Sequence, residues 1–256
     1  MSLPQIRAFL AELKLSGMQS HLDGCLESAR THQWTPEETL DALLQAEVDA
    51  RRQRAFAHRL RTSRLRASPA FEDLDLSVRR SLSKTTVRDI ASLSWLRDGR
   101  PLVLIGQTGV GKTFLAQAAG HRACQEGKTV LFLSVTHWLE QLQEARTSHT
   151  FLRFRDRMLR PDLLVLDDFG MKKLTAGEAE DFREILEERS FGKSLLLTTQ
   201  LPFAHWGEVI PDPVLLEALV DRIESPALVV TITGESYRKK NARREKGAIA
   251  SVDPES

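Results

Sequence analysis

A glycine-rich segment at residues 106–113 constrains this chain more than any other feature of its sequence. It reads Gly-Gln-Thr-Gly-Val-Gly-Lys-Thr and fits the pattern G-x-x-x-x-G-K-[ST]. An apolar run from Leu102 to Ile105 precedes it, and an alanine-rich stretch with helical character, Phe114 to Cys124, follows it. Because this pattern is meaningful only between a strand and a helix, the flanks argue against a chance glycine-rich turn. The sequence therefore predicts a phosphate-binding loop within an α/β domain.

The residue types in this loop suit a nucleoside triphosphate and its metal ion. Gly106, Gly109 and Gly111 allow backbone N–H groups to turn toward phosphate oxygens, and the following helix directs its positive dipole end at the same anion. Lys112 is expected to neutralise the β- and γ-phosphates, and Thr113 to offer its hydroxyl to Mg²⁺. ATP and Mg²⁺ are therefore the expected cofactors. The predicted nucleotide-binding loop consists of Gly106, Gln107, Thr108, Gly109, Val110, Gly111, Lys112 and Thr113.

A second apolar run, Leu163 to Leu166, ends in the carboxylates Asp167 and Asp168. A strand beside the phosphate loop places the first carboxylate near the metal, so Asp167 is predicted to hold Mg²⁺ through water. Asp168 is predicted to orient or deprotonate the attacking water. An apolar strand that merely leaves the core into a polar turn would end in the same way. The presence of Lys112 favours the catalytic interpretation.

The remaining pattern predicts a parallel sheet with crossover helices after about residue 70, preceded by helices only. We expect a helical DNA-binding domain at 1–68, an ATPase domain at 69–235 and a basic tail at 236–256. Gly127 and Gly192 stand where helices are expected to stop just before strands. The predicted strands are Leu102 to Ile105, Thr129 to Leu133, Leu163 to Leu166, Ser194 to Thr198 and Leu228 to Ile232.

The third of the N-terminal helices has a strong start signal. Thr35 offers an N-cap hydroxyl, Pro36 occupies the first helical position, and Glu38 is placed to return the hydrogen bond. From there the apolar residues Leu40, Leu44, Val48, Phe56 and Leu60 are expected to lie on one side, until Ser68 and Pro69 end the pattern.

Seven arginines and no acidic residue lie between Ala50 and Phe71. Guanidinium groups suit phosphate oxygens, and such clustering favours binding to the backbone of duplex DNA. A solvated helix face is the alternative, although such a face normally mixes Glu and Asp among its cations. The predicted DNA-binding residues are Arg51, Arg52, Arg54, Arg59, Arg61, Arg64 and Arg66.

The composition fits a globular protein of the cytoplasm. Apolar residues make up 41% of the 256 residues and charged residues 28%, and no apolar run is long enough to cross a bilayer. The start of the chain lacks the pattern of a secretory signal. Cys25 and Cys124 stand far apart, without a companion Cys or His at metal-ligand spacing, so neither a disulfide nor a cysteine-bound metal is expected.

Several further segments resemble the IstB-like ATPases of bacterial insertion sequences and, more distantly, the DnaC helicase loaders, both of the AAA+ class. The resemblance covers nearly the whole chain. Its segments are 13–18 (Leu-Lys-Leu-Ser-Gly-Met), the loop at 106–113, 166–170 (Leu-Asp-Asp-Phe-Gly), 197–202 (Leu-Thr-Thr-Gln-Leu-Pro), 206–208 (Trp-Gly-Glu), 219–222 (Leu-Val-Asp-Arg) and 234–238 (Gly-Glu-Ser-Tyr-Arg).

The resemblance implies an AAA+ core with ATP at the junctions of a ring or spiral homo-oligomer on duplex DNA. It implies that Gln200, with Thr199 beside it, senses the γ-phosphate, and that Arg222 completes the site of a neighbouring subunit. Arg238 would approach the phosphates in place of the arginine of a helical lid, for which too few residues follow the last strand. Many AAA+ proteins carry Glu where this chain has Asp168, so slow turnover is expected.

These features together predict an ATPase that helps a cognate transposase at its DNA target. A helicase loader with the same core is one alternative, and a small-molecule P-loop kinase with a merely solubilising arginine run is another. A nucleotide-gated DNA-binding scaffold with negligible turnover remains a third.

Overall fold

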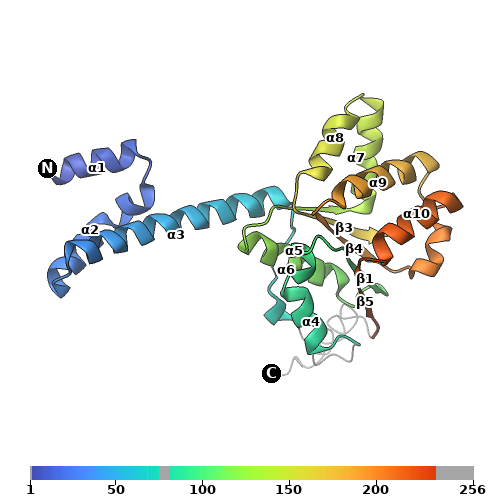
Figure 1. The fold of residues 1–256 in the computed structure, drawn as a ribbon, viewed down its shortest axis with the longest axis horizontal. Helices are drawn as coiled ribbons and strands as arrows, with labels where there is room; N and C mark the ends of the chain where they lie inside the picture. Colours follow the sequence, from blue (N-terminus) through green and yellow to red (C-terminus); the bar gives the residue numbers. More distant parts are fainter. Residues whose placement is uncertain (1, 68, 75–80, 235–256) are drawn as a thin grey trace, which may run out of the picture. The chain divides into compact units, whose positions relative to one another are not determined.

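The computed structural model describes residues 2–67, 69–74 and 81–234. Its centre is a five-stranded parallel sheet in the order β2-β3-β4-β1-β5 (Figure 1). Each predicted strand is present, within a few residues of its expected bounds. The strands are β1 (Leu102–Gly106), β2 (Val130–Ser134), β3 (Leu163–Phe169), β4 (Ser194–Thr199) and β5 (Leu228–Ile232).

Ten α-helices and two 3₁₀ segments are found in the described residues. The helices are α1 (Leu3–Glu12), α2 (Ser16–His32), α3 (Pro36–Ser63), α4 (Lys84–Ala91), α5 (Ser94–Arg97), α6 (Lys112–Gln125), α7 (Val135–Thr147), α8 (Phe151–Leu159), α9 (Ala176–Arg189) and α10 (Pro213–Glu224), and the 3₁₀ segments are η1 (Phe71–Asp73) and η2 (Phe203–Glu208).

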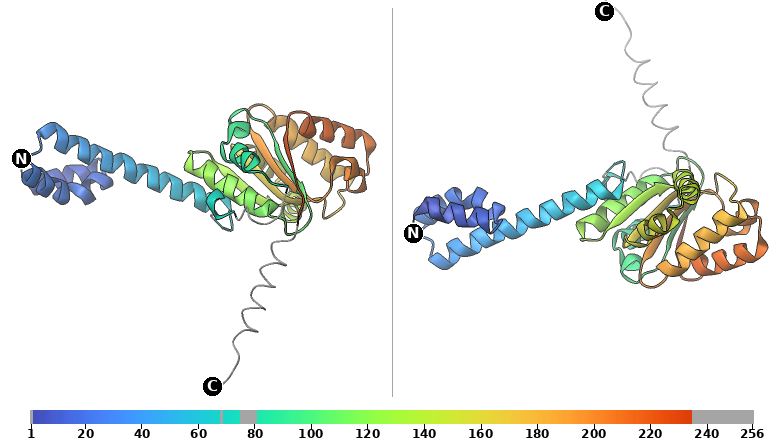
Figure 2. Two further views of the ribbon diagram at one scale, coloured as in Figure 1. Left: turned by 90° about the horizontal axis from the view of Figure 1, so that it is seen from below. Right: turned by 90° about the horizontal axis from the view of Figure 1, so that it is seen from above.

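Helices cover both faces of the sheet (Figure 2). Alternate strand residues such as Val103, Leu164 and Leu197 pack with apolar side chains from α7, α8, α9 and α10. The other face is covered by α6, whose alanine-rich surface allows it to lie close to the strands. Because both faces are buried, the strands consist of nearly continuous apolar runs. Gly127 and Gly192 both have positive φ before a strand, as predicted.

The structure divides into two compact units, with the division between His58 and Arg59 inside α3. The N-terminal unit has a small core of Leu10, Met18, Leu22 and Leu43. The predicted capping box of α3 is present, because Thr35 N donates to Glu38 Oε2 at 2.7 Å and Glu38 N donates to Thr35 Oγ1 at 3.2 Å.

For the first half of α3, the prediction of which side faces the core is wrong. Leu40, Leu44 and Val48 are 53%, 49% and 40% exposed, whereas Leu43 and Glu47 are buried. Glu47 Oε2 accepts hydrogen bonds from the backbone N–H groups of Gly17, at 2.6 Å, and Met18, at 3.2 Å. The start of α2 therefore packs on a polar side chain of α3, which an apolar pattern does not reveal.

Candidate nucleotide-binding site

The phosphate-loop motif lies at the carboxyl end of β1, the strand between β4 and β5, and its last two residues begin α6. Gly109 and Gly111 have φ values of 87° and 104°, a backbone region that residues with a Cβ rarely adopt. At Gly106 a Cβ would lie 2.3 Å from the carbonyl oxygen of Ile232 on β5, so a larger residue cannot fit there. These backbone requirements explain the glycines, and α6 directs its N-terminus at the loop.

Lys112 is buried, with 5% of its surface exposed, and folds back over the loop. Its Nζ donates to the carbonyl oxygens of Gly106, at 2.7 Å, and Gln107, at 3.0 Å. The ammonium group is therefore held at the mouth of the loop by oxygen acceptors of the loop itself. Phosphate oxygens carry more negative charge than carbonyl oxygens, so a triphosphate is a stronger partner for the same cation.

Asp167 is the buried carboxylate of the site, with 5% of its surface exposed. Its Oδ1 accepts a hydrogen bond from Thr113 Oγ1 at 3.1 Å and another from Thr198 Oγ1 at 2.5 Å. The structure therefore brings the end of β3 together with the first turn of α6. The acidic strand is not the direct neighbour of β1 that the sequence led us to expect, because β4 lies between β3 and β1. Burial raises the pKa of Asp167, and the neighbouring charge of Asp168 adds to this effect, although the two hydroxyl hydrogen bonds and Lys112 oppose it.

A β-bulge positions the two carboxylates differently. Leu166 pairs with Leu197 and Phe169 with Thr199, so that Asp167 and Asp168 together face a single residue of β4. Asp168 has φ of 62°, a left-handed conformation that Asp tolerates better than most residues. Asp168 is consequently exposed at the sheet edge while Asp167 remains buried.

Thr198 is the residue of the site that sequence reasoning missed. It is fully buried, and its hydroxyl oxygen also accepts the backbone N–H of Asp168 at 2.9 Å. One threonine thus contacts both acidic residues. The polar ending Thr198-Thr199-Gln200 of an apolar strand was a visible signal, but its first member is identified only through the bulge.

The two predicted sensor residues lie beside this cluster. Thr199 Oγ1 donates to the carbonyl oxygen of Phe169 at 2.9 Å, so it ties β4 to the residue after Asp168. Gln200 is exposed, and its Nε2 lies 3.3 Å from Met171 Sδ. The amide of Gln200 is therefore at the carboxyl edge of the sheet and contacts the loop that leaves β3.

Arg222 lies at the opposite end of the sheet from the phosphate loop. It lines a cleft of about 270 Å³ together with Arg100 and Pro101, which directly precede β1. Its guanidinium donates to Ser190 Oγ at 3.2 Å and lies 3.7 Å from Glu187 Oε1, both on or next to α9. A five-residue strand spans about 16 Å, so Arg222 is not part of the site of its own chain.

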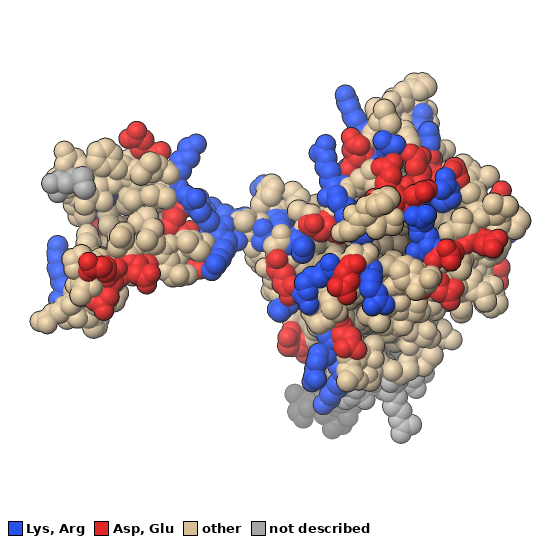
Figure 3. Space-filling model, viewed as in Figure 1, with Lys and Arg blue, Asp and Glu red and all other residues tan. Residues whose placement is uncertain are grey.

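The other predicted residues are distributed as follows. Arg238 lies outside the described residues. Lys and Arg side chains gather along the second half of α3 (Figure 3), but several have acidic neighbours. Arg51 and Arg54 pair with Glu47 at 2.7 and 3.4 Å, and Arg52 lies 3.6 Å from Asp49. Arg59 Nε donates to the carbonyl oxygen of Cys124 at 2.9 Å, whereas Arg61, Arg64 and Arg66 are exposed.

The residues present fit a Mg²⁺-bound triphosphate. Thr113 and Asp167 supply a hydroxyl and a carboxylate within hydrogen-bond distance of each other, and Mg²⁺ prefers oxygen ligands. Burial raises the pKa of Asp167, and a divalent ion at this position would compensate its buried negative charge. Among the described residues there is no group of three or more His, Cys, Asp or Glu side chains that could bind a metal by themselves.

None of the helices in the described part of the chain combines the length and the apolar content needed to span a membrane.

The chain is similar to proteins of insertion sequences. It is 34% identical over 238 residues to an insertion-sequence ATP-binding protein of Mycobacterium tuberculosis, and the match covers 93% of this chain and 95% of that protein. It is 31% identical to the IS21 ATP-binding protein of Pseudomonas aeruginosa, covering 94% and 91% of the two chains.

The DnaC helicase loader and DnaA are two of the solved structures with a similar fold. The DnaC helicase loader has a TM-score of 0.55 at 21% identity, covering 64% of this chain and 96% of the loader. AMPPCP-bound DnaA from Aquifex aeolicus has a TM-score of 0.57 at 21% identity, and here the match covers 75% of this chain and 59% of DnaA. At these identities the likeness establishes the AAA+ fold alone, and it confirms the predicted fold class.

The family comparison covers almost the whole chain. The family described as IstB-like ATP binding protein matches residues 8–245, which include the phosphate loop, the Asp167–Asp168 bulge and Arg222. The matching region includes most of each compact unit. The chain therefore belongs to the family of IstB-like ATP-binding proteins, as the sequence motifs had indicated.

Proposed function

We propose that this protein is a Mg²⁺-dependent ATPase that assembles with ATP on duplex DNA and assists a transposase. The observation that carries the ATPase part is the contact of Thr113 Oγ1 with Asp167 Oδ1 at 3.1 Å, because it joins the end of the phosphate loop to the acidic end of β3. Lys112 would hold the β- and γ-phosphates, and Thr113 and Asp167 the metal ion. The bound Mg²⁺ would supply positive charge to the phosphoryl group.

Asp168 is the candidate residue for orienting the attacking water. It is exposed at the sheet edge, next to the buried metal ligand, and its backbone N–H is fixed by Thr198. Its carboxylate is one methylene shorter than that of a glutamate, so it reaches less far. We therefore propose a slow hydrolysis that DNA accelerates.

The proposed assembly is supported by the location of Arg222. This cation lies at the amino end of β1, opposite the phosphate loop of the same chain. An arginine in that position can contribute to hydrolysis only at the site of another subunit, where it would stabilise charge on the transferred phosphoryl group. We propose that ATP sits at the junction between two copies of this chain in a ring or spiral.

The partner proposal rests on the relatives. Curated relatives of similar length are named as insertion-sequence proteins, and insertion sequences also encode transposases. A helicase loader with the same core is the alternative that the likeness to DnaC favours. Affinity capture from host cells separates the two, because the first recovers a transposase and the second a replicative helicase.

The ATPase proposal is tested by phosphate release with and without duplex DNA. The wild-type protein is expected to release phosphate faster with DNA, and Lys112→Ala is expected to lose ATP binding and ATP-dependent assembly. Lys84→Ala, which removes an exposed lysine at the start of α4, is the matched control. Normal DNA-stimulated hydrolysis in Lys112→Ala would refute the proposal, and phosphorylation of a small acceptor by a monomer would favour a kinase.

A further inference from the structure

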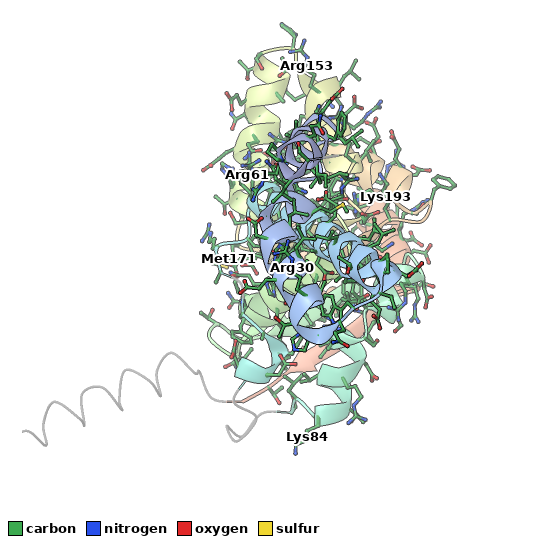
Figure 4. The ribbon with its side chains drawn as sticks, turned by 90° about the vertical axis from the view of Figure 1, so that its left-hand side faces the viewer. Arg30, Arg61, Lys84, Arg153, Met171 and Lys193 are labelled. Carbon is green, nitrogen blue, oxygen red and sulfur yellow. The ribbon has the colours of Figure 1, made fainter. Side chains whose placement is uncertain are left out.

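The loop that follows the acidic bulge carries an exposed pair of cations that the proposed chemistry does not use. Met171 is 63% exposed and lies at the margin of the structure in Figure 4, and Lys172 and Lys173 after it are also exposed. Within the described residues, neither lysine makes a hydrogen bond or an ion pair. Arg51 and Arg54 on α3, by contrast, both pair with the buried Glu47.

This exposed stretch is held firmly at both ends. On one side, the carbonyl oxygen of Phe169 accepts the hydroxyl of Thr199 at 2.9 Å, and a Cβ on Gly170 would lie only 2.8 Å from the side chain of Leu201. On the other side, Leu174 is buried, and its N–H donates to the carbonyl oxygen of Val209 at 2.8 Å. Residues 171–173 therefore form a short span between two fixed points.

This span lies next to the candidate catalytic residues. Met171 Sδ is 3.3 Å from the amide nitrogen of Gln200, so the loop contacts the candidate γ-phosphate sensor. Asp168 lies in the left-handed region immediately before Phe169, where the backbone has few alternative conformations for a residue with a Cβ. Lys172 and Lys173 directly follow the residue that contacts Gln200, and they lie on the same short stretch of chain as Asp168.

Two adjacent ammonium groups without acidic partners attract an anion with closely spaced charges. Phosphates along a nucleic-acid backbone have that property, and each contact releases counterions irrespective of sequence. We propose that residues 171–173 form a DNA-backbone sensor, in which contact of Lys172 and Lys173 with duplex DNA accelerates hydrolysis through Asp168 and Gln200. This inference rests on the proposed ATPase and names the element that makes it DNA-stimulated.

The test compares Lys172→Ala/Lys173→Ala with wild type in the full-length protein. Phosphate release is measured without DNA and with saturating duplex DNA, and DNA affinity and DNA-free assembly with ATP are measured separately. Lys84→Ala/Arg88→Ala, which removes two exposed cations from α4, is the control with the same change in charge.

The double loop variant is expected to keep its DNA-free rate and its assembly, while stimulation by saturating DNA falls toward onefold. The control variant is expected to keep full stimulation. Unchanged stimulation in the loop variant would overturn the sensor, as would a loss of assembly without DNA, which would assign the lysines to contact with a neighbouring subunit. If wild type itself hydrolyses no ATP or ignores DNA, the proposed function fails instead.

Discussion

Thr198 Oγ1 donates a hydrogen bond of 2.5 Å to Asp167 Oδ1 and accepts one of 2.9 Å from the backbone N–H of Asp168. One hydroxyl group on β4 therefore sets the position of both acidic residues on β3. Since Thr198 is fully buried, no water can replace its hydroxyl without rearrangement of the strand end. Thr198 is accordingly a positioning residue for the metal ligand and for the residue proposed to orient water.

Replacing Thr198 with valine keeps the shape of the side chain and removes the hydroxyl. The free energy of unfolding is expected to fall by about 2 kcal/mol, because a hydrogen bond to a charged group is lost and the Asp168 N–H loses its partner. Turnover is expected to fall more than ATP affinity, since the phosphate loop is untouched. Thermal melting and steady-state kinetics measure the two effects. Thr198→Ser keeps the hydroxyl and is expected to restore turnover. If Thr198→Ser turns over as slowly as Thr198→Val, the hydroxyl is not the group that positions the two acidic residues.

The raised pKa of Asp167 gives the nucleotide-free protein a specific pH dependence. A carboxyl group whose pKa is higher in the folded state stabilises the fold fully below its ordinary value of 3.8, and this contribution is lost as the pH rises through the folded-state pKa. Asparagine does not ionise, so Asp167→Asn lacks this pH dependence. The melting temperature of the nucleotide-free wild type is therefore expected to fall relative to Asp167→Asn as the pH rises above this value.

With Mg²⁺ and ATP bound, the wild type is expected to have a higher melting temperature than Asp167→Asn. The metal ion compensates the buried charge of Asp167, and binding to the folded state alone raises the melting temperature. Asp167→Asn lacks the anionic ligand and is expected to gain little from Mg²⁺. Melting curves across pH, with and without Mg²⁺-ATP, provide the measurement. Equal stabilisation of both proteins by Mg²⁺-ATP would remove Asp167 from the metal site.

Much of the unit that contains the sheet could be predicted because each local signal agrees with the next. Five apolar runs became five strands, and glycines such as Gly127 and Gly192 marked the turns before strands. The phosphate loop was predictable because backbone geometry and close packing require glycine at fixed positions. At Gly106, for example, the carbonyl oxygen of Ile232 leaves no room for a Cβ. Such requirements act over a few residues and are visible in the sequence itself.

Features that depend on register or on distant polar contacts could not be predicted. The role of Thr198 follows from the bulge at Asp167 and Asp168, which no periodicity indicates. The buried face of α3 was missed because Glu47 occupies it as an acceptor for two N–H groups of another helix, while Leu44 remains exposed. Apolar periodicity alone assigns the opposite orientation to both residues.

Arg189 is a buried cation that holds the amino edge of the sheet together. Only 2% of its surface is exposed, and its guanidinium donates to the carbonyl oxygens of Met158 at 2.7 Å, Pro161 at 3.1 Å and Ser194 at 2.5 Å. Burial lowers the pKa of Arg189 to about 10, so the group still carries its charge at neutral pH. It joins the end of α8 to the starts of β3 and β4.

Arg189→Met is expected to lower the free energy of unfolding by about 3 kcal/mol or more, because several buried carbonyl groups lose their donor at once. Arg189→Lys retains one ammonium group as a donor, and its free energy of unfolding is expected to lie between those of Arg189→Met and wild type. Denaturant unfolding measures all three proteins. The exposed Arg153 serves as control, since Arg153→Met is expected to stay close to wild type. Equal stability of Arg189→Met and wild type would show that the carbonyl groups find other donors.

A subunit-mixing experiment tests whether Arg222 acts on a neighbouring site. Asp168→Asn lacks the carboxylate proposed to orient water but keeps the phosphate loop and presents Arg222, whereas Arg222→Ala has an intact acidic site and lacks the arginine. Each variant alone is expected to be nearly inactive, and a mixture is expected to recover hydrolysis at junctions where the intact site of one subunit faces the intact arginine of the other. Phosphate release across a series of mixing ratios provides the measurement. A mixture no more active than its components would contradict a role in trans.

The ion pairs on α3 make the candidate DNA-binding arginines unequal. Arg51 and Arg52 have carboxylate neighbours that compete with phosphate, whereas Arg64 and Arg66 follow the helix and are exposed. The double variant Arg64→Gln/Arg66→Gln is therefore expected to lower the slope of log affinity against log salt by up to about 1.8, at about 0.9 per phosphate contact. Arg51→Gln/Arg52→Gln is expected to change this slope less, with thermal melting used to confirm folding. Equal reductions would mean that Glu47 and Asp49 release their partners at no cost. An unchanged slope in both variants would exclude these four arginines from the DNA interface.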